Sequence, residues 1–219
     1  MSTSTTAEAS ALTKPLLRGV SHQVSFFIAL AAGLWLISRA GGTMRWGCVV
    51  YTFALCGQFA VSALYHRPNW KRPEVRQWWR RLDHAFIMIL IAGTGTPISI
   101  SIGTETSRTL LIVLWCGATL GALRALVWIT APKPVAAGIA LVLAWLSFPY
   151  LPELSASMGP SATRWLVVGG VLYSLGALAY ATKRPNPWPK VFGYHEIFHA
   201  FVVLAAACHF VSVVSVVTT

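Results

Sequence analysis

The chain has 219 residues, of which 56% are hydrophobic and only 11% are charged, and its mean hydropathy is +0.64. These values exclude an ordinary soluble domain, in which charged residues make up about a quarter of the total. The formal net charge of +11 raises the question of nucleic-acid binding, which depends on where the charges lie.

Taken in chain order, the sequence begins with a polar tail and continues as a series of apolar segments. Residues 1–15 are expected to form a disordered cytoplasmic tail. Residues 16–219 are expected to form one all-α domain of seven transmembrane helices, because short connections leave no room for a soluble domain. The predicted spans are Val24–Ser38, Trp46–Tyr65, Leu82–Ile102, Thr109–Thr130, Val135–Leu151, Trp165–Thr182 and Ile197–Val217.

The positive charges are divided unevenly between the two sides of this arrangement. Twelve Lys and Arg residues fall on the side of the N-terminus, and only Arg39, Arg45, Arg108 and Arg164 fall on the other side. Short loops rich in Lys and Arg remain cytoplasmic, so we expect a cytoplasmic N-terminus and an extracytoplasmic C-terminus. The basic excess then reflects topology and contact with anionic membrane lipids, and no nucleic-acid partner is expected.

Five of the six histidines gather at the cytoplasmic ends of the predicted helices. They are His22, His66, His84, His195 and His199. Only His209 stands apart, about 15 Å further along its helix than His199. Because four different helix ends bring these side chains to one membrane surface, the arrangement predicts a metal site there.

The predicted ligands of this site are His66, His195 and His199. His195 and His199 are four residues apart and share one helix face. The three imidazoles can bind Zn²⁺ and leave its fourth tetrahedral position open, as in catalytic zinc sites. Asp83 and Ser62 are the candidate catalytic residues, with Asp83 acting as a general base or orienting a ligand. Alternatively, Asp83 pairs with a neighbouring arginine, and Ser62 only allows close helix packing.

Three more residues are candidates for supporting the ligands or facing a substrate. His22 and His84 lie at the same membrane surface as the predicted ligands, although interfacial histidines also bind backbone groups or lipid headgroups. Arg124 lies near the cytoplasmic end of the fourth span. Its guanidinium either reaches the interface or lines a cavity and holds a lipid phosphate.

The sequence His195-Glu-Ile-Phe-His199 also matches the H-E-x-x-H pattern of zinc proteases, in which the glutamate is the general base. Intramembrane proteases of this kind usually carry the motif early in the chain, whereas here it opens the last span. Glu196 points about 100° away from His195 around the helix, and its charge suits a helix N-terminus. An intramembrane protease is therefore the least favoured hypothesis.

Several motifs resemble the progestin and adiponectin receptor superfamily, and more closely its bacterial haemolysin III-like branch. The resemblance rests on Ser62-Ala-Leu-Tyr-His66, Asp83, Arg18-Gly-Val-Ser-His22, Ile91-Ala-Gly-Thr-Gly-Thr-Pro97 and the run from Lys183 to His199. These motifs occur in the family's order, although Gly95 stands where the branch more usually has Tyr. The resemblance implies seven membrane helices, a cytoplasmic N-terminus and location in the bacterial plasma membrane.

The same resemblance implies zinc bound by His66, His195 and His199, with Asp83 and Ser62 beside it. Because the superfamily is similar to ceramidase-type membrane hydrolases, our first hypothesis is a zinc-dependent hydrolase of a lipid amide or ester. The second hypothesis is a non-enzymatic protein that affects the bilayer or its permeability, with zinc as a clip between the second and seventh helices. Membrane lipids are the expected partners in either case.

Overall fold

The computed structural model describes residues 14–218, and almost all of them are helical. The helices are α1 (Val20–Arg39), α2 (Gly42–His66), α3 (Pro73–Ile102), α4 (Glu105–Val127), α5 (Lys133–Trp145), the short 3₁₀ helix η1 (Phe148–Tyr150), α6 (Leu151–Thr182) and α7 (Tyr194–Val217). The predicted all-α fold is thereby confirmed for this part of the chain. Most of the predicted tail, residues 1–13, lies outside the described residues.

Six segments are long and apolar enough to cross a membrane, and one of them combines α5 and α6 into the single stretch Lys133–Thr182. The protein is therefore a multi-pass membrane protein. The predicted boundaries differ most from the structure in this stretch. The predicted fifth span ends at Leu151 and the sixth begins at Trp165, whereas α5 ends at Trp145 and α6 begins at Leu151. The residues before Trp165, which the sequence placed outside the sixth span, form the first half of α6, and Pro152 occupies the first turn of this helix, where proline is tolerated.

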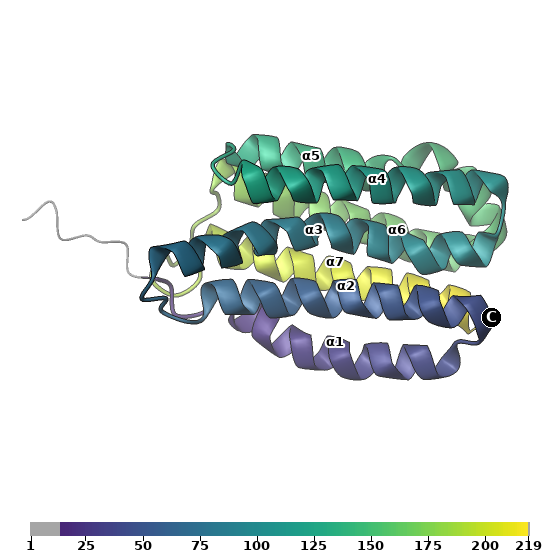
Figure 1. Cartoon of the computed structure of the whole chain (residues 1–219), viewed down its shortest axis with the longest axis horizontal. Helices are drawn as coiled ribbons and strands as arrows, with labels where there is room; N and C mark the ends of the chain where they lie inside the picture. Colours follow the sequence, from purple (N-terminus) through teal and green to yellow (C-terminus); the bar gives the residue numbers. More distant parts are fainter. Residues whose placement is uncertain (1–13, 219) are drawn as a thin grey trace, which may run out of the picture.

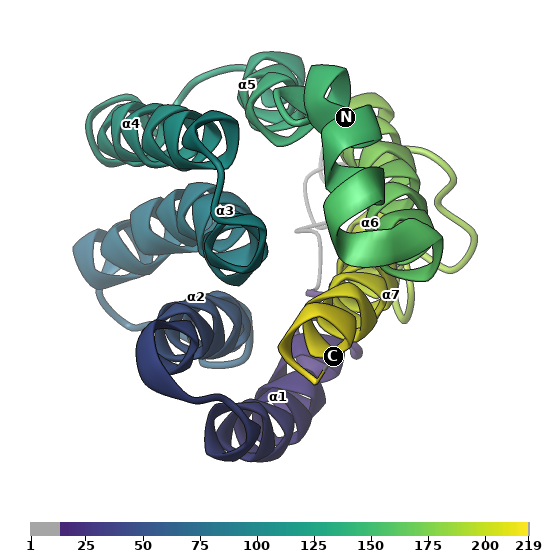
Figure 2. The ribbon, with the colours of Figure 1, turned by 90° about the vertical axis from the view of Figure 1, so that its right-hand side faces the viewer.

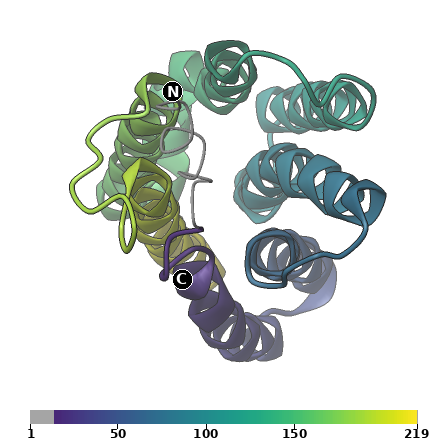
Figure 3. The same ribbon diagram turned by 90° about the vertical axis from the view of Figure 1, so that its left-hand side faces the viewer.

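The helices run alternately up and down, and consecutive helices lie next to each other (Figure 1). Seen end-on, they form a ring in chain order, and α1 packs against α7 to close it (Figures 2 and 3). This alternation collects the first residues of α1, α3, α5 and α7 and the last residues of α2, α4 and α6 at one end. That end holds the candidate site, and the C-terminus lies at the other end (Figure 1).

The most buried helices are α2 and α3, in which 61% and 56% of the apolar span is covered by the rest of the protein. Small residues allow them to approach closely: a Cβ added at Gly57 would come within 2.1 Å of the Phe86 ring. On α3, the helix begins at Pro73, well before the predicted span at Leu82, so the basic segment is a helical extension. The result is a closely packed helix pair that carries His66 and Asp83.

Candidate metal centre

His66, His195 and His199 form a tight cluster, with one ring nitrogen of each lying within 4.8 Å of the others. His66 is the last residue of α2, whereas His195 and His199 occupy the first turns of α7. The Nε2 atoms of His66 and His195 are 3.1 Å apart. All three predicted ligands are therefore brought together from two helices that are distant in sequence.

The spacing of these nitrogens suits a tetrahedral metal ion. With Zn–N distances of 2.0–2.1 Å, two ligand nitrogens on tetrahedral zinc lie roughly 3.3 Å apart, close to the separation of His66 and His195. His66 and His199 are buried, with 7% and 2% of their surface exposed. Together with the partly buried His195, they supply three imidazole nitrogens, a donor set that fits zinc and leaves one coordination position free.

Asp83 and Ser62 lie beside this cluster, as the sequence predicted for the catalytic pair. Asp83 Oδ2 is 3.9 Å from His66 Nε2. The Ser62 hydroxyl lies near the Asp83 carboxyl, although their geometry falls short of a hydrogen bond, and Ser62 Oγ is buried without a partner among the described residues. Both side chains are thus near enough to act on a molecule held at the cluster.

His22 packs directly against one of the candidate ligands. Its ring is stacked on that of His199, with centroids 4.0 Å apart and planes 5° from parallel. Neither ring nitrogen of His22 has a hydrogen-bond partner within the described part of the chain. The ring therefore fixes the orientation of His199 from α1, and it is not part of the three-nitrogen cluster.

His84 and Arg124 lie further from the cluster and line the adjacent cavity. His84 Nδ1 lies 2.8 Å from the Arg80 carbonyl oxygen, to which it donates, and Nε2 lies 3.4 Å from the Tyr180 hydroxyl. The Arg124 side chain lines the cavity, and its Nε is buried without a partner among residues 14–218. Of the two readings for Arg124, the structure favours the one that places it at a cavity wall.

Glu196 is engaged in structural contacts. Arg18 Nε donates a hydrogen bond to Glu196 Oε1 in a partly buried ion pair, and the backbone N–H of Gly193 donates to Oε2 at 2.8 Å. Glu196 thereby caps the start of α7 and ties it to the segment before α1. Both oxygens of the carboxylate accept structural hydrogen bonds, which argues against a role as a protease base.

Sequence reasoning missed several residues that build this end of the molecule. Gly19 has a left-handed backbone, with φ +76°, and a Cβ there would lie 2.7 Å from the Cβ of His66. Arg18 and Gly19 both belong to the quoted Arg18–His22 motif, but nothing in that motif identified Glu196 as the partner of Arg18. Tyr180 also lies beside the site, with its ring 5.9 Å from that of His195.

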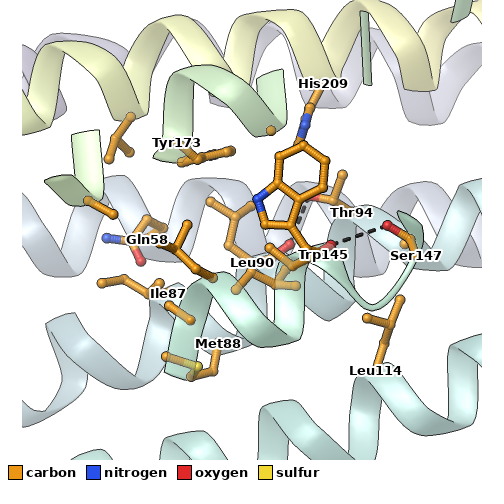
Figure 4. A pocket seen from close by; sticks show the side chains of 18 of the residues that line it. Gln58, Ile87, Met88, Leu90, Thr94, Leu114, Trp145, Ser147, Tyr173 and His209 are labelled. Atoms are coloured by element: carbon orange, nitrogen blue, oxygen red, sulfur yellow. Dashed lines mark hydrogen bonds between the residues drawn. The ribbon is translucent and has the colours of Figure 1, made fainter. Parts of the chain in front are cut away.

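A cavity of about 180 Å³ begins at the candidate site and runs into the bundle. Helices α3 to α7 supply most of its walls, and Gln58 of α2 also contributes. It reaches from Asp83 and His195 to Ser99, which is about 24 Å from Asp83 along α3 at 1.5 Å per residue. Figure 4 shows that aliphatic and aromatic side chains dominate its middle section. Its shape and lining suit an apolar chain.

A sequence model of the family described as Haemolysin-III related matches residues 10–210. The chain belongs to this family. It is 26% identical over 200 residues to the hemolysin-3 homolog of Bacillus subtilis, covering 89% of this chain and 90% of the relative. It is also 24% identical over 216 residues to the adiponectin receptor protein of Drosophila melanogaster, covering 87% of this chain and 48% of the relative.

A third similarity is to the human monocyte to macrophage differentiation factor, with 23% identity over 170 residues that cover 75% of this chain and 67% of the relative. The predicted resemblance to the superfamily and to its haemolysin III branch is therefore confirmed. All candidate site residues, from His22 to His199, lie within the stretch that matches the haemolysin III family. The geometry described above is thus built on the part of the chain that defines the family.

Proposed function

We propose that this haemolysin III-family protein is a zinc-dependent membrane hydrolase that cleaves an amide or ester bond in a lipid. The observation that carries the proposal is the position of the histidine cluster, which lies at one end of an elongated apolar cavity. A lipid chain in the cavity would place its polar end beside Asp83 and His195. That end carries the bond to be cleaved.

The proposed membrane arrangement follows the charge distribution. The chain would cross a bacterial plasma membrane seven times, with its N-terminus in the cytoplasm, the site near the cytoplasmic face and the C-terminus outside. Helices α5 and α6 would make separate crossings within the stretch Lys133–Thr182, because they run in opposite directions (Figure 1). Anionic lipid headgroups would then surround the basic loop between α2 and α3.

His66, His195 and His199 would hold the zinc ion. When bound, zinc polarises a carbonyl group and lowers the pKa of a water molecule, which is the Lewis-acid chemistry that hydrolysis requires. The Asp83 carboxylate would take a proton from the attacking water and return it to the leaving nitrogen or oxygen as the amide C–N or ester C–O bond breaks. Ser62 would hydrogen-bond Asp83 or the substrate, and the buried walls would limit access of other water molecules.

The ion pair of Glu196 argues against the protease hypothesis, since its carboxylate is committed to Arg18 and Gly193. The clip hypothesis has one observation in its favour, because His66 and His195 join the end of α2 to the start of α7. A metal at this position would tie the two helices together whether or not any reaction occurs. The experiment must therefore separate zinc binding from catalysis.

The decisive comparison is wild type against Asp83→Asn, with the purified protein reconstituted in lipid. Wild type should contain about one zinc ion per chain and release fatty acid from ceramide or a related lipid. Asp83→Asn should keep its zinc and lose at least about a hundredfold in rate, as expected for a general base. Lipid turnover that is unchanged in the variant removes Asp83 from the mechanism, and zinc binding without any turnover by wild type supports the clip.

The ligand assignment has a separate test. His66→Ala, His195→Ala and His199→Ala should each lose the metal, whereas His209→Ala, about 15 Å beyond His199 along α7, should retain it. Metal analysis of the purified variants gives the answer directly. Retention of zinc by all three ligand variants would show that the assignment is wrong.

A further inference from the structure

The middle of the cavity contains a polar side chain without a partner. Gln58 of α2 lines the cavity, and only 3% of its surface is exposed. Its amide oxygen is fully buried and accepts no hydrogen bond from any described residue. A buried acceptor without a donor is costly, so a group that binds in the cavity and donates to Gln58 would gain affinity.

Other polar side chains line the same section. Tyr173 of α6 and His209 of α7 also border the cavity, and Figure 4 shows them together with Gln58. His209 Nε2 lies 3.0 Å from the Leu166 carbonyl oxygen and donates to it, so Nδ1 of the neutral ring is left as an acceptor. The aliphatic residues Ile87, Met88 and Leu90 line the same section. The middle of the cavity therefore offers hydrogen-bonding groups beside aliphatic walls.

The distance of these side chains from the histidine cluster follows from their positions along the helices. Gln58 precedes His66 by two turns of α2, which places it about 12 Å from the metal centre along the helix axis. His209 lies about 15 Å beyond His199 along α7. An extended lipid chain whose carboxyl carbon sits at the histidines would present the carbon atoms near its middle to both side chains.

We propose that Gln58, with Tyr173 and His209, forms a binding site for a hydroxyl group in the middle of a lipid chain. The ligand hydroxyl would donate to Gln58 Oε1 and accept a hydrogen bond from the Gln58 amide N–H or the Tyr173 hydroxyl. The lipids bound best would then be those with mid-chain hydroxylated acyl groups. The inference rests on the proposed function for the orientation of the lipid, with its polar end at the histidines.

The test compares two fatty acids of equal length. Ricinoleate carries a hydroxyl near the middle of its chain, and oleate does not. Binding to the full-length protein in detergent is measured as displacement of radiolabelled oleate by either unlabelled acid. We expect ricinoleate to bind about tenfold more tightly, since it satisfies a buried acceptor. Equal affinities, stronger binding of oleate, or no binding of either acid would overturn the proposal.

Gln58→Leu keeps the side chain's approximate volume and removes its amide. The variant should bind the two acids equally, because ricinoleate can no longer form the hydrogen bond to residue 58 and oleate never formed one. Thr119→Val is the matched control, since the Thr119 hydroxyl is bonded to Trp115 O on an exposed face of α4 away from the cavity. The control should keep the preference, and a preference retained by Gln58→Leu would refute the role of Gln58.

Failure of the proposed hydrolysis can be told apart from failure of this inference. The displacement assay does not require turnover, so it is repeated with Asp83→Asn. If wild type hydrolyses no lipid and both proteins still prefer ricinoleate, the hydroxyl site stands and the enzymatic proposal falls. If lipid is hydrolysed without any preference for hydroxylated chains, the enzymatic proposal stands and the hydroxyl site falls.

Discussion

Breaking the ion pair between Arg18 and Glu196 should destabilise the protein asymmetrically. Only 3% of the Glu196 side chain is exposed, whereas 23% of the Arg18 side chain is. Arg18→Ala leaves a buried carboxylate without a counter-charge, and we expect a loss of about 3 kcal/mol in the free energy of unfolding. Glu196→Gln should cost less, about 1 kcal/mol, because Gln still accepts from Gly193 N–H and the Arg18 guanidinium can turn towards solvent.

The double variant Arg18→Ala with Glu196→Gln should be more stable than Arg18→Ala alone, because it no longer buries an unpaired charge. The coupling free energy between the two sites should be about 2 kcal/mol. Unfolding is followed in detergent by intrinsic fluorescence or by loss of circular dichroism. The matched control is Arg108→Ala, which breaks an exposed pair with Glu105 and should change stability by less than about 0.5 kcal/mol.

Two results would refute this reasoning. The first is an Arg18→Ala variant that is no less stable than the Arg108→Ala control. The second is a double variant whose loss of stability equals the sum of the two single losses, since independent sites are additive and a coupled pair is not. Either result would mean that Glu196 does not depend on Arg18, and a catalytic role for this glutamate would need to be considered again.

Three further variants test the packing around the site. Gly19→Ala should lower zinc content, because the added Cβ meets that of His66 at 2.7 Å and the backbone φ of +76° disfavours alanine. Gly57→Ala should lower the free energy of unfolding by about 1–3 kcal/mol through its clash with the Phe86 ring, as thermal unfolding in detergent will measure. Ser62→Ala should retain zinc and stability, because the buried hydroxyl has no partner to lose within residues 14–218.

The sequence was sufficient to predict the end of the bundle at which the histidines meet. Alternating helices place the starts of odd-numbered helices and the ends of even-numbered helices at one membrane face, so the location of His66 and His195 at the same face follows from counting spans. The helix boundaries were harder to predict. Hydropathy alone predicts too short a helix within Leu151–Thr182, because polar residues lower the mean hydropathy of its first half. Gly159, with φ +81°, also interrupts the helical backbone there.

Contacts between distant side chains were beyond sequence reasoning for a physical reason. The partner of Glu196 is Arg18, and the ring stacked on His199 is that of His22, so both contacts depend on α1 packing against α7. Span counting places helix ends at a membrane surface but does not state which helices are neighbours. The lack of a partner for Gln58 likewise depends on the positions of all surrounding atoms.

Closure of the ring by α1 and α7 also constrains the order of events during biosynthesis. Helix α1, which contributes His22, is synthesised before α7, which contributes His195 and His199, so the histidine cluster is incomplete until α7 has been made. A nascent chain halted before Tyr194 would carry His66 as its sole candidate ligand. A metal ion held by all three histidines could therefore be taken up only after α7 had been synthesised and had packed beside the end of α2.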